Sequence, residues 1–168
     1  NATRHVIWII FGSDTEVGGH LHKLLMEKGH RCVLVSRGER FSRRNASHYH
    51  LNTMQQADYR RLIDSVAPAE ETAELRLGHL FALETAGLDL CTEASASEMQ
   101  RISGESALSL VQALAGAEAQ RRGRLWLVTC GSRYVAGTTD VVYPFQAPLW
   151  GLGGVIALEH PELKCTRI

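Results

Sequence analysis

The run His5–Phe11 (HVIWIIF) most constrains how this chain can fold, because it is rich in β-branched and aromatic side chains. Such a run predicts a strand that is buried on both faces, as the central strands of a parallel sheet are. Gly12 and the polar residues after it break the strand, and Asp14 or Thr15 is predicted to cap a following helix. A second short strand is predicted over 31–36. This strand, helix and strand together form the opening of a doubly wound α/β fold.

The rest of the chain continues the alternation of strands and helices. The pattern predicts strands over 75–83 and 124–130, helices over 55–66, 98–122 and 147–159, a surface loop over 85–96, and a final strand that begins near 164. The chain has 168 residues, of which 45% are hydrophobic and 21% are charged. This length and composition are enough for a buried core that needs no disulfide or metal. We therefore expect one α/β domain over residues 1–168.

The charge balance and the cysteines limit the expected partners and the expected cellular compartment. Because 18 basic side chains are matched by 18 acidic ones, the net charge favours neither nucleic acid nor a membrane as a partner. The 4 cysteines are widely spaced, which fits reduced thiols in the cytoplasm, and we expect them to be small core residues. No run of about 18 apolar residues is present. The first residues form neither a signal peptide nor an initiator methionine, so we expect a cytoplasmic piece of a longer protein.

The turn after the first strand is where a dinucleotide-binding fold presents glycines and a helix N-terminus to a pyrophosphate. Two of the glycines typical of short-chain dehydrogenases are present, as Gly12 and Gly18, but the middle position holds Glu16. A carboxylate there repels a diphosphate and can instead occupy the anion site at the helix N-terminus. Arg37 lies just after the second strand, where enzymes specific for NADP hold the 2′-phosphate. On its own, an Arg at this position is more typical of a solvated surface residue. We therefore predict that the turn after the first strand no longer binds a cofactor.

The sequence also lacks the catalytic pattern of short-chain reductases, which combine a Ser with a Tyr-x-x-x-Lys pair. The residues four positions before the chain's lysines are Gly19, Leu24 and His160. The nearest analogue is Ser132 with Tyr143, but Ala147 stands where the lysine is required. We interpret Ser132 and Tyr143 as loop and packing residues and predict no catalytic residue in this chain.

Metal and hydrolase sites are also disfavoured. His20 and His22 are two apart on a predicted helix, so their side chains diverge, and His48 and His50 lie in a basic segment without nearby Cys or carboxylate clusters. We expect surface histidines and no metal site. No Gly-x-Ser-x-Gly elbow is present.

Two long segments carry a resemblance to a known family. The segments 124–131 (RLWLVTCG) and 146–162 (QAPLWGLGGVIALEHPE) closely resemble the ketoreductase region of modular polyketide synthases. Shorter matches are 29–35, 38–41, 58–62, 79–83 and 109–114, so that the resemblance covers nearly the whole chain. Cys130 and Gly154 depart from the family pattern, which usually has Arg at both positions.

The resemblance implies the N-terminal structural subdomain of such a ketoreductase, a truncated Rossmann-like three-layer fold with a mostly parallel sheet. In the family this subdomain binds no cofactor and supports a catalytic subdomain, which we expect downstream and outside this chain. The parent enzyme reduces a β-ketoacyl thioester on an acyl carrier protein with NADPH. Two alternatives stay open, a self-contained NADP-dependent short-chain reductase and a pseudo-ketoreductase in a non-reducing or methyltransferase-containing module.

The predicted helix 147–159 has features of a contact surface. Leu149, Leu152 and Ile156 form one apolar stripe, and Trp150 adds a large apolar surface. Its glycines each destabilise an isolated helix by roughly 1 kcal/mol relative to Ala, so we expect compensating close packing, including packing against the catalytic subdomain.

Overall fold

The computed structural model of the chain describes residues 5–68, 73–85, 92–116, 123–132 and 143–168. Within these residues the strands form one 7-stranded sheet in the order β3-β4-β2-β1-β5-β6-β7. They are β1 (His5–Phe11), β2 (Arg31–Arg37), β3 (Ser42–Arg43), β4 (His48–Leu51), β5 (Ala73–His79), β6 (Gly123–Leu127) and β7 (Thr166–Arg167). Neighbouring strands are parallel except β3 and β4, which are antiparallel.

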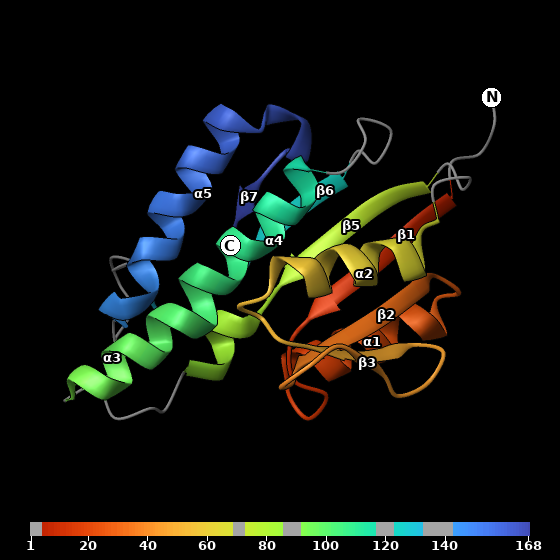
Figure 1. Cartoon of the computed structure of the whole chain (residues 1–168), viewed down its shortest axis with the longest axis horizontal. Coiled ribbons are helices and arrows are strands. Elements are labelled where there is room, and N and C mark those ends of the chain that lie inside the picture. The colour runs from red at the N-terminus through yellow and green to blue at the C-terminus, as the bar shows by residue number, and fades with distance from the viewer. Residues whose placement is uncertain (1–4, 69–72, 86–91, 117–122, 133–142) are drawn as a thin grey trace.

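Helices cover both faces of the sheet (Figure 1). The helices are α1 (Val17–Glu27), α2 (Gln56–Val66), α3 (Glu93–Gln100), α4 (Ser106–Ala115) and α5 (Ala147–Glu159). Short turns of other helical types are η1 (Phe81–Thr85), η2 (Arg101–Glu105), η3 (Pro144–Gln146) and η4 (Pro161–Leu163). The helices α2, α4 and α5 share the larger apolar core with one face of the sheet, while α1 packs on the other face. The predicted three-layer α/β fold with a mostly parallel sheet is confirmed.

The central strands are buried as their sequences predict. Ile7, Ile9 and Phe11 of β1 belong to the larger core together with Leu75 and Leu77 of β5. The register places Ile7 beside Leu75 and Ile9 beside Leu77, so that alternate residues of both strands face the same core.

Some predicted boundaries are wrong, for local reasons. The strand predicted over 75–83 ends at His79, since η1 begins at Phe81, just after the Leu80 N–H has donated to the Phe11 carbonyl at 2.8 Å. The predicted loop over 85–96 gives way to α3 from Glu93, since Thr92 caps that helix by accepting from the Ser95 N–H at 3.1 Å. The residues 86–91 and 117–122 of the predicted loop and long helix lie outside the described residues.

The long helix also differs from the prediction in its middle. Instead of one regular helix from 98, α3 continues through the π-helical turn η2 into α4. Within η2 and the start of α4, Ser103 donates to the Met99 carbonyl at 2.7 Å and Ser106 donates to the Ile102 carbonyl. These serines therefore satisfy backbone carbonyls within the buried helix.

The cysteines are less uniform than predicted. Cys32 is buried in the smaller core, as expected, whereas Cys165 is partly buried and Cys130 is exposed at the end of β6. Cys130 is therefore not a core residue. Cys91 lies outside the described residues. None of the described helices is both long enough and apolar enough to cross a lipid bilayer.

Candidate functional site

The turn between β1 and α1 lies at the carboxyl ends of β1 and β5. Starting from β1, the chain places β2 and β4 on one side and β5, β6 and β7 on the other. In open α/β sheets this change of direction creates the crevice where ligands bind. The predicted loop residues Gly12, Glu16 and Gly18 therefore stand where a nucleotide would be held.

The glycines of this turn are required by packing. A Cβ atom on Gly18 would stand 2.9 Å from the Ser13 carbonyl oxygen, and one on Gly19 would stand 2.0 Å from the Asp14 carbonyl oxygen. The Gly19 N–H donates to the Ser13 carbonyl at 2.9 Å, which draws the turn onto the start of α1. The backbone thus needs glycine at these positions whether or not a ligand is present.

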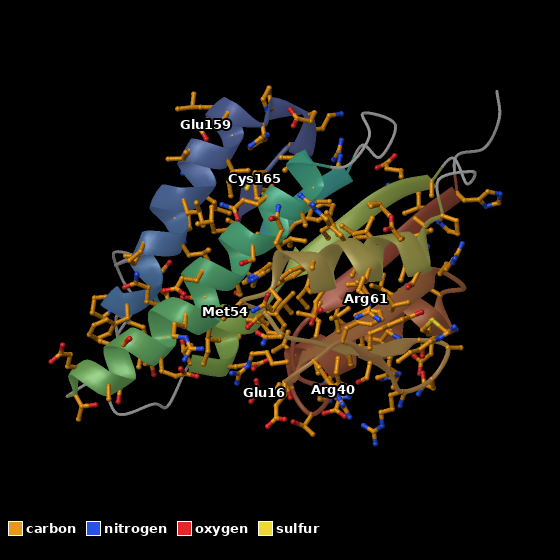
Figure 2. All side chains as sticks on the ribbon, viewed as in Figure 1. Glu16, Arg40, Met54, Arg61, Glu159 and Cys165 are labelled. Carbon is orange, nitrogen blue, oxygen red and sulfur yellow. The ribbon has the colours of Figure 1, made fainter. Side chains whose placement is uncertain are left out.

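Glu16 is the N-cap residue of α1, so the prediction of Asp14 or Thr15 as the cap is wrong. The Thr15 N–H instead donates to the Ser13 hydroxyl at 3.2 Å, and Asp14 pairs with Arg44 at 3.7 Å. The Glu16 side chain is exposed and makes no capping hydrogen bond (Figure 2). It therefore does not fill the anion site at the helix N-terminus by hydrogen bonding.

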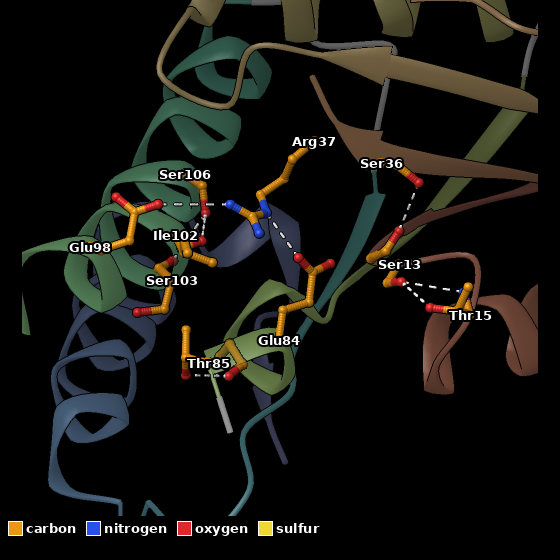
Figure 3. Close-up of polar contacts among 12 residues, drawn as sticks. Ser13, Thr15, Ser36, Arg37, Glu84, Thr85, Glu98, Ile102, Ser103 and Ser106 are labelled. Atoms are coloured by element: carbon orange, nitrogen blue, oxygen red, sulfur yellow. Dashed lines mark hydrogen bonds and ion pairs between the residues drawn. The ribbon is translucent and has the colours of Figure 1, made fainter. Parts of the chain in front are cut away.

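Arg37 is exposed, as predicted, and it also has ion-pair partners. Its Nε donates to Glu84 Oε2 at 2.8 Å, and its guanidinium lies 3.9 Å from Glu98 Oε1. Figure 3 shows the Arg37 side chain extending from the end of β2 to Glu84 on η1 and Glu98 on α3. Residues from three distant parts of the sequence thus converge at this edge of the sheet.

Glu84 is the least exposed member of this cluster, with 12% of its side chain accessible to solvent. Burial raises the pKa of the Glu84 carboxyl, against the opposing effects of Arg37 and of a hydrogen bond from the Ser13 backbone. Glu16 also raises this pKa through its like charge. Glu84 thus pairs with Arg37, and the turn that follows β1 affects its pKa.

These residues do not fit a nicotinamide dinucleotide. The guanidinium that would meet a 2′-phosphate is paired with the Glu84 carboxylate at 2.8 Å. The carboxylates of Asp14, Glu16 and Glu98 lie on the surrounding segments. A diphosphate here would meet mostly negative charge and would have to displace existing hydrogen bonds.

The carboxyl end of β6 is held together by a buried amide. Gln146 is 1% exposed, and its Oε1 accepts from the Cys130 N–H at 2.9 Å. Its Nε2 donates to the Ala82 carbonyl at 2.9 Å and lies 3.2 Å from the Thr85 hydroxyl. One side chain thus joins the start of α5 to η1 and to the end of β6.

Ser132 is buried and Tyr143 is partly buried in this region. The Ser132 hydroxyl lies 2.9 Å from that of Thr129, and the Tyr143 N–H donates to the Gly131 carbonyl at 2.7 Å. Ala147 begins α5, so no lysine stands beside the Tyr143 ring at that position. Residues 133–142, which join Ser132 to Tyr143 in the sequence, lie outside the described residues.

The histidine prediction is wrong for His22, which is 8% exposed and packs edge to face on His48 with ring centroids 4.8 Å apart. Burial, and secondarily the charge of His48, lower the pKa of His22. His20 is exposed, as expected, and His50 is partly buried. No group of three or more metal-ligating side chains occurs within the described residues.

The sequence analysis did not identify Glu84 or Gln146 as site residues. Glu84 follows an apolar run that predicts a strand, and its partner Arg37 is 47 positions away. Gln146 bonds to Ala82 across 64 positions. Neither residue has a local spacing pattern that could have revealed these contacts.

No protein-family profile matches the chain. It is 49% identical over 55 residues to the pikromycin polyketide synthase component PikAII of Streptomyces venezuelae, an alignment that covers 33% of this chain. It is 43% identical over 83 residues to the erythronolide synthase EryA3 of Saccharopolyspora erythraea, covering 42% of this chain. The alignments span only 1% and 2% of those relatives.

Solved structures share the fold at lower sequence identity. An N-terminal ketoreductase from the macrolactin assembly line matches 99% of this chain and 32% of its own, with a TM-score of 0.70 and 16% identity. A keto acid-selecting module with adenylation and ketoreductase domains matches 98% of this chain and 13% of its own, with a TM-score of 0.79 and 18% identity. A short-chain dehydrogenase from Streptomyces avermitilis matches 96% of this chain and 63% of its own, with a TM-score of 0.64 and 12% identity. The resemblance to the ketoreductase region of polyketide synthases is thus confirmed, by sequence similarity to polyketide synthases and by the Rossmann-like fold shared with ketoreductases and short-chain dehydrogenases.

Proposed function

We propose that this chain is the structural half of a polyketide synthase ketoreductase and stabilises a catalytic half elsewhere in the same polypeptide. The catalytic half would reduce a β-ketoacyl thioester on an acyl carrier protein with NADPH, in the cytoplasm. The observation that carries this proposal is the pairing of Arg37 with Glu84, at the position where a cofactor phosphate would be held. Because Arg37 was the residue that favoured a self-contained NADP-dependent reductase, its pairing with Glu84 counts against that alternative.

The surface of α5 supports a partner in the same polypeptide. Leu149 and Ile156 face the core, as predicted, but Val155 is 47% exposed and Leu158 is 84% exposed. A helix that is apolar around its circumference is normally buried on more than one side. We assign the exposed side of α5 to the contact with the catalytic half.

Calorimetric titration with NADPH tests the binding part of the proposal. The wild-type chain is expected to show no heat of binding, and so is a Glu16→Gly variant, because Arg37 stays paired with Glu84. Micromolar binding by the wild type would restore the reductase alternative.

Co-expression with the catalytic half tests the scaffold part. Leu158→Glu is expected to weaken co-purification of the two halves and to lower the melting temperature of the complex, since it places a charge on the apolar contact. Glu159→Gln is the matched control, because Glu159 is a neighbouring exposed residue at the end of α5 (Figure 2). Equal co-purification of the two variants would refute the assignment of this surface. Reductase activity of the complex separates an active ketoreductase from a pseudo-ketoreductase.

A further inference from the structure

The carboxyl ends of β1 and β5 carry two kinds of donor that bind phosphate groups in proteins. These are a backbone N–H beside a helix N-terminus, supplied by Ser13, and a guanidinium, supplied by Arg37. In a nucleotide-binding fold, donors of this kind are left free for the ligand. Here the Arg37 guanidinium is bonded to the carboxylate of Glu84, and the Ser13 backbone acts on the same carboxyl by lowering its pKa against the effect of burial.

Hydrogen bonds from Gln146 fix the backbone turn that carries Glu84. Glu84 lies on η1, where Ala82, two positions before it, and Thr85, the next residue, both accept from the buried amide of Gln146 at 2.9 and 3.2 Å. Thr85 also donates its hydroxyl proton to the Ala82 carbonyl at 2.7 Å. The carboxylate is therefore presented to the crevice by a turn that is fixed to β6 and α5.

The other charges of the crevice add to this effect. Glu98 lies 3.9 Å from the Arg37 guanidinium and 3.3 Å from that of Arg101. The charges therefore alternate in sign from Arg37 through Glu98 to Arg101. Glu16 lies close enough to Glu84 for its charge to act on that carboxyl. An incoming anion would have to replace Glu84 while facing two further carboxylates.

We propose that the carboxylate of Glu84 is an internal ligand at the carboxyl ends of β1 and β5, taking the place of a cofactor phosphate on Arg37. Glu84, and not Glu16, is then the group that excludes anionic cofactors. The inference deepens the scaffold function and rests on it in one respect, namely that the wild-type chain binds no NADPH. It also predicts that the donors remain intact, so that removal of Glu84 exposes a working anion site.

The test uses the 168-residue chain labelled with ¹⁵N and titrated with adenosine 2′,5′-bisphosphate or inorganic pyrophosphate. The amide signal of Ser13 and the Nε–H signal of Arg37 report on the crevice. In the wild type these signals should not move. In Glu84→Ala they should shift to saturation, with binding at least about tenfold tighter than in the wild type, as expected when one charge-assisted hydrogen bond becomes available. Adding Arg37→Ala should abolish the response.

Two further variants serve as controls. Glu74→Ala removes the acidic member of another ion pair, which lies 3.5 Å from Arg76, and should leave both signals unmoved. Glu84→Gln keeps the size of the side chain and removes only its charge. If Glu84→Ala does not fold, this variant with pyrophosphate provides the test, because the uncharged amide binds Arg37 less tightly than the carboxylate does.

The outcomes separate this inference from the scaffold function. If the folded Glu84 variants do not respond, or if only Glu16→Gly binds, internal occupancy by Glu84 is refuted and the scaffold function is unaffected. If the wild type binds as tightly as Glu84→Ala, both are refuted. If only Glu84→Ala binds but the chain fails to stabilise a catalytic half, the internal ligand stands and the scaffold function fails.

Discussion

His79 should make the stability of this chain sensitive to mild acid. The ring is fully buried at the end of β5, with ring centroids 6.4 Å from Phe11 and 5.3 Å from Phe81. Its Nε2 lies 2.9 Å from the hydroxyl of Ser106, which donates its own proton to the Ile102 carbonyl. The imidazole is therefore the donor to Ser106, and burial of the ring favours its neutral form. Burial lowers the pKa of His79 from 6.5 to about 4.

The size of the effect follows from these two pKa values. In the unfolded chain His79 takes up a proton near 6.5, whereas in the folded chain it does so only near 4. The unfolded state therefore binds more protons between these values, and the free energy of unfolding falls as the pH decreases. From about pH 7.5 to about pH 5 the loss from this single ring is about 2 kcal/mol.

Urea unfolding at several pH values in this range measures the loss. His79→Gln cannot titrate, so the difference in unfolding free energy between wild type and variant should shrink by about 2 kcal/mol on acidification. This difference cancels the contributions of the carboxylates and of His22, whose lowered pKa acts in the same direction. His30→Gln removes an exposed histidine and should leave the slope unchanged. Parallel curves for wild type and His79→Gln would refute the reasoning.

Further predictions concern α5, the buried amide and the crevice. A Cβ at position 151 would meet no atom within 4 Å, so Gly151→Ala should stabilise the chain by about 0.5–1 kcal/mol. Gly153→Ala places a Cβ 3.1 Å from Leu127 and should not stabilise the chain. Thermal unfolding of the two variants will show this difference. Gln146→Leu removes all hydrogen bonds of a buried amide and should lower the unfolding free energy by about 2–4 kcal/mol in urea. Glu84→Gln removes a charge whose pKa is raised by burial, so its melting temperature at neutral pH should equal or exceed that of the wild type; a clear decrease would contradict this.

Local sequence patterns predicted the elements whose bounds depend on the local sequence alone. The apolar run His5–Phe11 gave the bounds of β1, and Pro148 and Pro161 bracket α5 at the bounds the structure has. Prediction failed where a strand and a following helical turn are both apolar. The apolar run after Leu75 continues through Phe81 because η1 is also buried, so hydrophobicity could not locate the end of β5.

The site was predictable only in its location. The strand-to-helix turn and the doubtful role of Arg37 could be inferred from the order of the elements. The partners of Arg37 could not, because Glu84 and Glu98 reach it only after β2, η1 and α3 have been brought to one edge of the sheet. Long-range ion pairs of this kind have no fixed spacing in sequence.

A glycine-containing turn and a nucleotide site are separable properties of this fold. Gly18 and Gly19 are needed because the turn packs onto the first residues of α1, where any Cβ would collide with a backbone carbonyl. That requirement arises from the path of the chain and persists when no ligand is bound. Binding depends instead on donors that lack an internal partner, and here Glu84 supplies that partner to Arg37. In related chains, the presence of an acidic residue near the end of the short helical turn after β5, where Glu84 lies, should therefore separate scaffolds from cofactor-binding subdomains better than the glycines do.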